Sequence, residues 1–379
     1  MNVSSQLTCP PTVSLDMYAF DLVMGFLLPG LFCLFGILGN VISLAVLWSD
    51  RSQSPTFLTL KALALSDLVL LTCAFLQQVM PIYIHVSGCM HFACLRIGYL
   101  RIYTWPVICI AQMTSVWLTV LISAERHSAI CRPLRAYGFS NVRKLKWSIL
   151  VVLVVSVLFN LPRFFEFTPK EEALFGTNLT YIAIADTTMR TDPVYRYAYN
   201  TASFCLIVYA APIGIITLLN VSIVVRMRRA KRRWSELSRR QQREVKATLM
   251  PLCIVTVCFF CGTQSLISFI LDAVFVGRDV LWIQIYTAVV NLFVTVNSAA
   301  NFLIFYVFGS KFRTLLRTMI TCWRDGHMLR YHDSPLLRRQ FRVRLRSSSI
   351  NSRNGISRGS HAESYVAPPG VAHRSNTTF

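Results

Sequence analysis

The sequence predicts an all-α membrane protein, a bundle of seven transmembrane helices followed by a short amphipathic cytoplasmic helix. Of its 379 residues, 54% are hydrophobic and only 15% are charged, and the mean hydropathy is +0.50. Soluble globular domains carry roughly 25% charged residues, so the composition argues against a chain of two or three soluble domains. Long uncharged runs of this kind are typical of a polytopic membrane protein.

Seven apolar segments predict the membrane spans. They lie near residues 22–49, 57–84, 97–124, 147–162, 197–225, 247–271 and 280–307. The first contains 28 residues without a formal charge. As a helix it would be roughly 42 Å long, more than the ~30 Å hydrocarbon core of a bilayer. An odd number of spans places the two ends of the chain on opposite sides of the membrane.

The formal charge of +21 is unevenly divided between alternate loops. Of the 38 Lys and Arg residues, 31 lie on the side that contains 50–61, 126–146, 226–246 and 311–379. The positive-inside rule makes this side cytoplasmic and the N-terminus extracellular. The basic excess is therefore a signal of membrane topology, and we expect a lipid bilayer and no nucleic acid as a partner.

Four parts of the chain are expected. Residues 1–21 form an extracellular segment and 22–307 form the seven-span bundle. Residues 308–322 alternate apolar and basic side chains, and we expect Phe308, Phe312, Leu315, Leu316 and Met319 to share the apolar face of an interfacial helix. Residues 323–379 are rich in Arg and Ser and form a disordered basic cytoplasmic tail.

Several single residues are candidates for covalent modification. Asn2 and Asn178 begin Asn-x-Ser/Thr sequons on the predicted outer side, where glycosylation occurs. Cys322, at the end of the amphipathic helix, is a candidate for palmitoylation. Cys9, Cys89 and Cys94 are the clearly extracellular cysteines, and three thiols allow one disulfide bond. No charged segment with a cleavage site precedes residue 22, so the first span is expected to act as the membrane anchor.

Asp67 lies in the middle of the second span. A charged side chain near the bilayer centre costs ~2.5–3.5 kcal/mol on insertion scales, so its presence needs a physical reason. Polar side chains at comparable depth are Asn40, Ser115, Asn297 and Asn301. An anion among amides and hydroxyls suits a small cation. The alternative is a hydrogen-bonded cluster that serves only packing.

Glu125 and Arg126 close the third span at the cytoplasmic face. The arginine could pair with its neighbouring acid or with Glu244, at the foot of the sixth span. The alternatives are an ordinary arginine that extends to the membrane surface and a helical Arg240–Glu244 pair.

Short motifs with a common order run through the spans. They are Gly39-Asn40, Leu63 to Leu68, Ser123 to His127, Pro133-Leu134, Pro212 and Asn297 to Phe305. Their joint spacing resembles that of rhodopsin-like G-protein-coupled receptors over roughly residues 20–322. Within that family the chain is most similar to invertebrate FMRFamide-type neuropeptide receptors. The supporting segments are Ile110 to Gln112, Ser115 to Val120, Ala129 to Ala136 and, the most distinctive, Asn160 to Glu166.

The resemblance implies roles for the polar residues. The family's sodium pocket, which favours the inactive state, would be lined by Asp67, Ser115, Asn297 and Asn301. Its activation switch would comprise Glu125, Arg126, Glu244, Asn301 and Phe305, with Arg126 held by the two glutamates and released toward the G protein. No cofactor is implied other than an allosteric sodium ion. The implied partners are a peptide outside and a heterotrimeric G protein and arrestin inside, at the plasma membrane.

The chain also departs from the family pattern. Phe302 and Phe305 replace a proline and a tyrosine, His127 replaces a tyrosine, and Cys261 to Gln264 stand where Cys-Trp-x-Pro is usual. Arg101 occupies the usual third-span cysteine position, and residues 163–196 contain no cysteine. The usual bridge to this loop is therefore impossible, and a substitute disulfide among the outer cysteines, with Cys89 and Cys94 as the candidate pair, is expected.

The composition of the spans and of the outer mouth, the extracellular end of the bundle, limits which class of ligand the protein can bind. Residues 97–124 contain no acid, which disfavours a biogenic amine, and 280–307 contain no lysine, which excludes a retinal Schiff base. An aromatic, mildly acidic mouth suits a peptide that carries Arg beside an aromatic residue. The candidate ligand contacts are Trp105, Ile108, Gln112, Glu166, Phe269, Asp272, Tyr286 and Asn291.

The predicted function is a G-protein-coupled receptor for an FMRFamide-like neuropeptide of the amidated Arg-Phe type. No predicted span carries a His-Glu-x-x-His or Gly-x-Ser-x-Gly motif, so an enzyme is not expected. One alternative is a non-signalling or constitutively biased receptor of the same fold, because the sixth- and seventh-span motifs are altered. Another is an ion-coupled transporter, although the unequal loops show no inverted repeat.

Overall fold

The structure, a computed structural model, describes residues 20–50, 55–79, 97–131, 142–173, 180–232, 249–274 and 281–324, to which the following statements apply. The chain divides into two compact units, Met1–Leu316 and Arg317–Phe379. All helices discussed below lie in the first unit, except that the last helix continues into the second. The division of the chain into four parts at 21, 307 and 322 stays a prediction.

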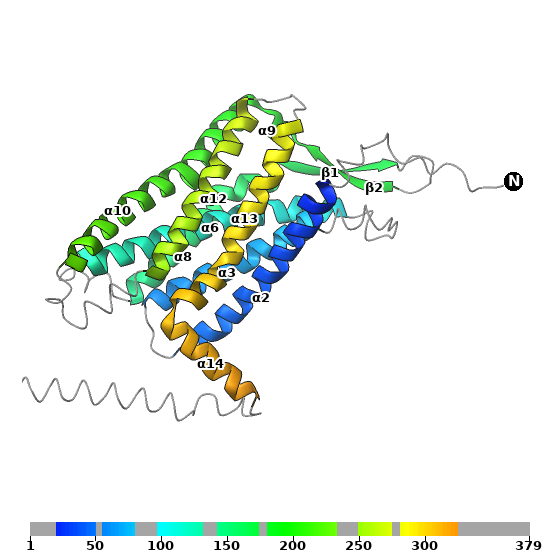
Figure 1. Cartoon of the computed structure of the whole chain (residues 1–379). Helices are drawn as coiled ribbons and strands as arrows, with labels where there is room; N and C mark the ends of the chain where they lie inside the picture. Colours follow the sequence, from blue (N-terminus) through cyan, green and yellow to red (C-terminus); the bar gives the residue numbers. More distant parts are fainter. Residues whose placement is uncertain are drawn as a thin grey trace, which may run out of the picture. The chain divides into compact units, whose positions relative to one another are not determined.

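Helices make up most of the described chain (Figure 1). The first three spans are η1 (Asp21–Leu27) with α2 (Leu28–Trp48), α3 (Pro55–Ala74) with η2 (Phe75–Val79), and α6 (Ile97–Cys131). The next two are α8 (Val142–Asn160) with η3 (Leu161–Phe165), and η4 (Tyr195–Ser203) with η5 (Cys205–Ala210) and α10 (Ala211–Arg232). The last two are α12 (Leu249–Val274) and α13 (Leu281–Phe308), followed by α14 (Ser310–Arg324).

Six helical stretches of the described chain are long and apolar enough to cross a membrane, and α12 contributes a shorter apolar stretch, Leu252–Ser268. These seven helices correspond one to one with the seven predicted spans. Several helices extend beyond the predicted apolar segments: α6 continues to Cys131 and α10 to Arg232. The apolar window marks the part of a helix that lies in hydrocarbon, whereas the helix itself continues into charged sequence.

The central helix of the bundle is α6. It packs against α3, α8, α10 and α12, while α13 packs against α2, α3 and α12. Two glycines of α2 allow the close approach to α13. A Cβ atom at Gly36 would lie 2.8 Å from the Cβ of Ala299, and one at Gly39 would lie 2.8 Å from the Cβ of Phe302. Small residues at such interfaces let membrane helices approach closely.

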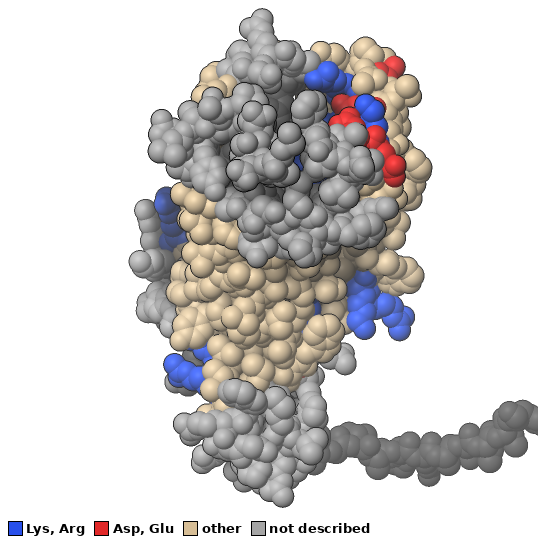
Figure 2. Space-filling model, turned by 90° about the vertical axis from the view of Figure 1, so that its right-hand side faces the viewer, with Lys and Arg blue, Asp and Glu red and all other residues tan. Residues whose placement is uncertain are grey.

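Polar and apolar residues are distributed as a membrane environment requires. Large apolar side chains are exposed on the outside of the bundle, among them Leu31, Leu38, Val151 and Leu158. Polar side chains such as Asn40, Thr59, Asp67 and Ser115 are buried between the helices. On the face shown in Figure 2, acidic side chains gather at one end beside Lys and Arg, and the central area is mainly uncharged, with further Lys and Arg at its edges. Within lipid, polar groups must be satisfied inside the protein.

A β-hairpin follows the fourth span. Strands β1 (Phe167–Ala173) and β2 (Thr180–Asp186) are antiparallel, with Phe167 opposite Asp186 and Ala173 opposite Thr180. The short helix α9 (Thr188–Thr191) leads from β2 to the fifth span. Sequence analysis predicted only a long loop here, because β1, with the sequence Phe-Thr-Pro-Lys-Glu-Glu-Ala, has no alternation of apolar and polar residues.

The amphipathic helix is confirmed, with different ends. It begins at Ser310, and Phe312, Leu315 and Leu316 are buried as predicted. The assignment of Phe308 to this apolar face is wrong, because Phe308 ends α13 and its side chain is exposed. The ammonium group of Lys311 lies 2.6 Å from the carboxylate of Asp50, which ties the start of α14 to the end of the first span.

Replacing Gly36 by Ala should lower the melting temperature of the purified receptor in detergent. The added Cβ atom would lie within 3.0 Å of both Leu71 and Ala299, and overpacking of this kind typically costs ~1–3 kcal/mol. The control is Gly214→Ala on α10, where an added Cβ meets no atom within 4 Å. Equal melting temperatures for the two variants would contradict the close α2–α13 contact.

Candidate functional site

Asp67 is the centre of a buried polar group that joins three helices. Its side chain is fully buried on α3. The hydroxyl of Ser115 on α6 donates a hydrogen bond to its Oδ1 at 2.9 Å. The amide of Asn301 on α13 donates to its Oδ2 at 2.6 Å. Three of the four predicted sodium-pocket residues are thus in direct contact, and each carboxylate oxygen has a donor.

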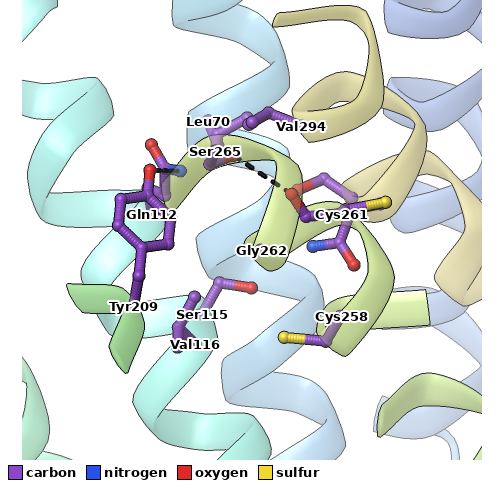
Figure 3. A pocket seen from close by; sticks show the side chains of 12 residues that line it. Leu70, Gln112, Ser115, Val116, Tyr209, Cys258, Cys261, Gly262, Ser265 and Val294 are labelled. Atoms are coloured by element: carbon purple, nitrogen blue, oxygen red, sulfur yellow. Dashed lines mark hydrogen bonds between the residues drawn. The ribbon is translucent and has the colours of Figure 1, made fainter. Parts of the chain in front are cut away.

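A small cavity of about 20 Å³ lies beside this group, room for about one water molecule. Asn297, the fourth predicted residue, lines it together with Ser115. The cavity is also bordered by Gly262 on α12, at the position where the family's bulky side chain would stand (Figure 3). An added Cβ at Gly262 would come no closer than 3.4 Å to Ile213, so the glycine leaves this volume unfilled.

Gln112 and Tyr209 border the other side of the cavity. The Nε2 atom of Gln112 on α6 donates to the hydroxyl of Tyr209 on η5 at 2.7 Å, and Figure 3 shows the two side chains pointing toward one another. Of the predicted ligand contacts whose side chains are described, Gln112 borders the cavity. Tyr209 was not predicted from the sequence.

At the foot of α6, Glu125 and Arg126 both contact α3 rather than each other. Glu125 Oε1 accepts a hydrogen bond from Thr59 at 3.4 Å, and a guanidinium nitrogen of Arg126 donates to the hydroxyl of Thr56. No ion pair of Arg126 is found within the described ranges. This differs from the expected pairing, because adjacent residues on a helix do not face each other. Glu244 lies outside the described residues.

The predicted seventh-span switch residues are both buried. Asn301 contacts Asp67, as described above. Phe305 packs edge-on against Phe312 of α14, with ring centroids 5.8 Å apart. Phe302, in place of the family's proline, lies against Gly39 of α2, so the larger side chain fits because α2 has no side chain at that point.

Glu166, predicted as a ligand contact, is completely buried. Its carboxylate accepts hydrogen bonds from Trp105, Arg163, Arg190 and Tyr195. Trp105, another predicted contact, is thus joined to Glu166 rather than turned toward open space. Arg163, Arg190 and Tyr195 were not predicted individually. The only sequence signal for them was the distinctive segment Asn160 to Glu166, which contains Arg163.

The other predicted ligand contacts are spread along the helices. Ile108 is half-buried on α6, and Asn291 is exposed on α13. The Tyr286 hydroxyl donates to Oε1 of Gln264 at 3.0 Å and so joins α13 to α12. The side chains of Phe269 and Asp272 lie outside the described set, although α12 includes both positions. The described structure therefore brings only some of the predicted ligand contacts together.

Five residues predicted to carry a modification or a disulfide fall where the structure gives no description of the side chain. Asn2, Asn178, Cys89 and Cys94 lie outside the described residues, and Cys322 lies on α14 with its side chain outside that set. Glycosylation, palmitoylation and the outer disulfide stay predictions.

Comparison with known proteins identifies the family. Residues 39–305 match the family described as 7 transmembrane receptor (rhodopsin family). The match covers most of the chain, and the chain belongs to this family of receptors. Family membership confirms the seven-helix fold and agrees with a receptor rather than an enzyme or a transporter. It also agrees with the multi-pass membrane location.

Some of the individual relatives are named as FMRFamide receptors. The chain is 29% identical to a Drosophila melanogaster protein named FMRFamide receptor, over 85% of this chain and 59% of that protein. It is 28% identical to the FMRFamide peptide receptor frpr-18 of Caenorhabditis elegans, over 77% of this chain and 67% of that protein. A third relative, the probable G-protein coupled receptor frpr-1 of Caenorhabditis elegans, is 27% identical over 78% of each chain. The chain thus spans less than two thirds of the fly receptor.

Asn301→Ala should lower the melting temperature, because it removes the hydrogen bond to a fully buried carboxylate. An unmade hydrogen bond of this kind costs ~1–3 kcal/mol, and more for a charged group. Thermal unfolding of the purified full chain measures the effect, with Asn291→Ala, an exposed position on the same helix, as the matched control. A melting temperature as high as that of the control would show that the contact adds nothing to stability.

Proposed function

We propose that the protein is a plasma-membrane receptor that couples an FMRFamide-like neuropeptide to heterotrimeric G proteins. Its N-terminus is extracellular and its tail cytoplasmic, in keeping with the 31 of 38 basic residues on one side. The observation that carries the proposal is the buried group around Asp67, in a rhodopsin-family bundle whose named relatives include FMRFamide receptors.

Two polar sites, one in the middle of the bundle and one at its cytoplasmic end, support a receptor with an inactive and an active state. Asp67 holds α3, α6 and α13 together in the middle of the bundle, and Arg126 is held by α3 at its cytoplasmic end. A ligand changes such contacts only through a different affinity for the two states. In the active state, Arg126 leaves Thr56 and faces the G protein, which docks on the basic segments 127–146 and 226–246. Arrestin uses the same cytoplasmic surface.

The ligand class follows from the outer end of the bundle and from the relatives. An amidated Arg-Phe terminus carries a cation and a ring, which acidic and aromatic side chains recognise by charge-assisted hydrogen bonds and stacking. Exposed candidates at this end are Trp282, Glu171 and Asp186. The deeper contacts of the proposal are Trp105, Ile108, Gln112, Phe269, Asp272, Tyr286 and Asn291. Glu166 can contact the ligand only if the ligand displaces one of the four side chains that now donate hydrogen bonds to its carboxylate.

Amidated Arg-Phe peptides should activate G proteins in cells that express the wild-type chain, and Arg126→Ala should abolish the response at equal surface expression. Peptides with a free carboxyl terminus, or with citrulline in place of arginine, should be at least about tenfold weaker, because each loses a charge or a hydrogen bond worth ~1.4 kcal/mol or more. The measurement is nucleotide exchange on the G protein. Silence toward a broad peptide panel, with the receptor at the surface, contradicts the ligand assignment.

A receptor without normal signalling is the second candidate, and two observations favour it. Gly262 leaves the cavity beside the Asp67 group unfilled, and the described part of the chain gives Arg126 a hydroxyl partner rather than an acid. A weakly held Arg126 would make the receptor active without ligand. The same assay separates the two functions, because high exchange before peptide addition, lost in Arg126→Ala, indicates a constitutively biased receptor.

The Asp67 group also fits an allosteric sodium ion. Sodium prefers hard oxygen ligands, and the buried carboxylate, the Ser115 hydroxyl and Asn297 offer such atoms beside a cavity of one-water size. Asn301 completes the proposed pocket by holding the second carboxylate oxygen. No other cofactor is proposed.

Sodium chloride should raise the melting temperature of the wild-type receptor relative to choline chloride at equal ionic strength. An ion that binds only the folded state stabilises it by mass action. Asp67→Asn removes the anionic ligand and should abolish the difference, whereas Asp186→Asn, at an exposed acid, should keep it. A sodium effect that persists in Asp67→Asn would place the ion elsewhere.

A further inference from the structure

The hairpin β1–β2 has no covalent tie to the helices. Residues 163–196 contain no cysteine, so only non-covalent contacts can hold this segment. Both strands nevertheless pack on α6. At Gly98, near the start of α6, an added Cβ would lie 2.2 Å from the carbonyl oxygen of Ile182 in β2. The strand backbone therefore lies directly on the helix, and only glycine allows this contact.

Glu166, between η3 and β1, contacts four elements around the base of the hairpin. Its carboxylate accepts hydrogen bonds from the following four donors: Trp105 Nε1 on α6 at 3.2 Å, Arg163 Nη1 on η3 at 3.3 Å, Arg190 Nη1 on α9 at 3.2 Å and the Tyr195 hydroxyl on η4 at 2.9 Å. These donors belong to the third, fourth and fifth spans and to the segment that follows β2.

Arg163 extends the contact to the fifth span. Its side chain is 1% exposed, and it donates to Oδ1 of Asn160 at 3.2 Å and to Oδ1 of Asn200 at 2.9 Å. Its guanidinium lies 4.3 Å from the centre of the Phe204 ring, a cation–π arrangement that stabilises a desolvated cation. The end of α8 is thereby fixed to η4.

The outer members of the group bind the hairpin itself. Arg190 is 30% exposed and also pairs with Asp186, the last residue of β2, at 3.0 Å. Its guanidinium lies 4.3 Å from the ring of Phe167, the first residue of β1. Because Phe167 and Asp186 are opposite each other in the register, Arg190 holds both strands at the point where they leave the bundle.

We infer that Glu166 is a positioning residue that clamps the hairpin to α6, η3 and η4 in place of a disulfide bond. A buried carboxylate with all its partners holds a single geometry, and removing it leaves a buried, uncompensated cation at Arg163. An isolated two-stranded hairpin is at best marginally stable in water, so loss of the clamp should also unfold β1 and β2. The inference goes beyond the proposed function and requires no ligand.

Hydrogen–deuterium exchange of the purified full chain in lipid nanodiscs tests the clamp. Glu166→Gln should raise the exchange rate of the β2 amides (180–186) at least about tenfold, because amides of an open segment lose protection. The amides of α13 should exchange as in the wild type. Glu172→Gln is the matched control, since its ion pair with Lys170 lies on the surface, with side chains 39% and 64% exposed. Unchanged β2 exchange in Glu166→Gln overturns the inference.

A second variant covers the case in which Glu166→Gln fails to fold. Trp105→Phe removes one donor and leaves every charge of the clamp paired. It should raise β2 exchange in the same direction by a smaller factor, whereas Trp147→Phe, at an exposed tryptophan of α8, should not.

Discussion

Inside a hydrocarbon layer, every polar group must find its partner within the protein, and this constraint accounts for the arrangement of the bundle. The outside of the helices is apolar, and the polar side chains meet in a few buried groups. Asp67 joins α3, α6 and α13, and Asn40 on α2 donates to the carbonyl of Ser298 at 3.1 Å. Four helices are thus held by amides, a hydroxyl and one carboxylate rather than by apolar contact alone.

The spans could be predicted from the sequence because bilayer thickness sets the length of an apolar run. The polar group around Asp67 could be predicted because a charged residue in a span demands partners. The ends of the helices could not, since a helix continues beyond the apolar run, as α10 does to Arg232. The hairpin was missed because β1 carries no strand-like alternation, and its register depends on pairing with a distant segment and on docking at Gly98.

The prediction for Glu166 shows that sequence does not reveal which polar groups contact each other in the folded protein. An acid at the outer end of a span is a reasonable ligand contact, and the sequence alone cannot tell whether its charge is already neutralised. Its partners Trp105 and Tyr195 lie 61 and 29 residues away along the chain. At the cytoplasmic end, Arg126 likewise contacts a residue that is distant in the sequence, Thr56 on another helix. Which polar groups meet is decided by helix packing, whereas the sequence shows only which groups need a partner.

Because Gly262 has no side chain, α12 places no large side chain at its position beside the central cavity. The aromatic ring that borders the cavity belongs to Tyr209 on η5, and it is held by Gln112 of α6 (Figure 3). A rotation of α12 about its own axis therefore sweeps no ring through the cavity at this level. The aromatic side chain at this level thus belongs to the fifth span, and its printed hydrogen bond joins it to the third span rather than to α12.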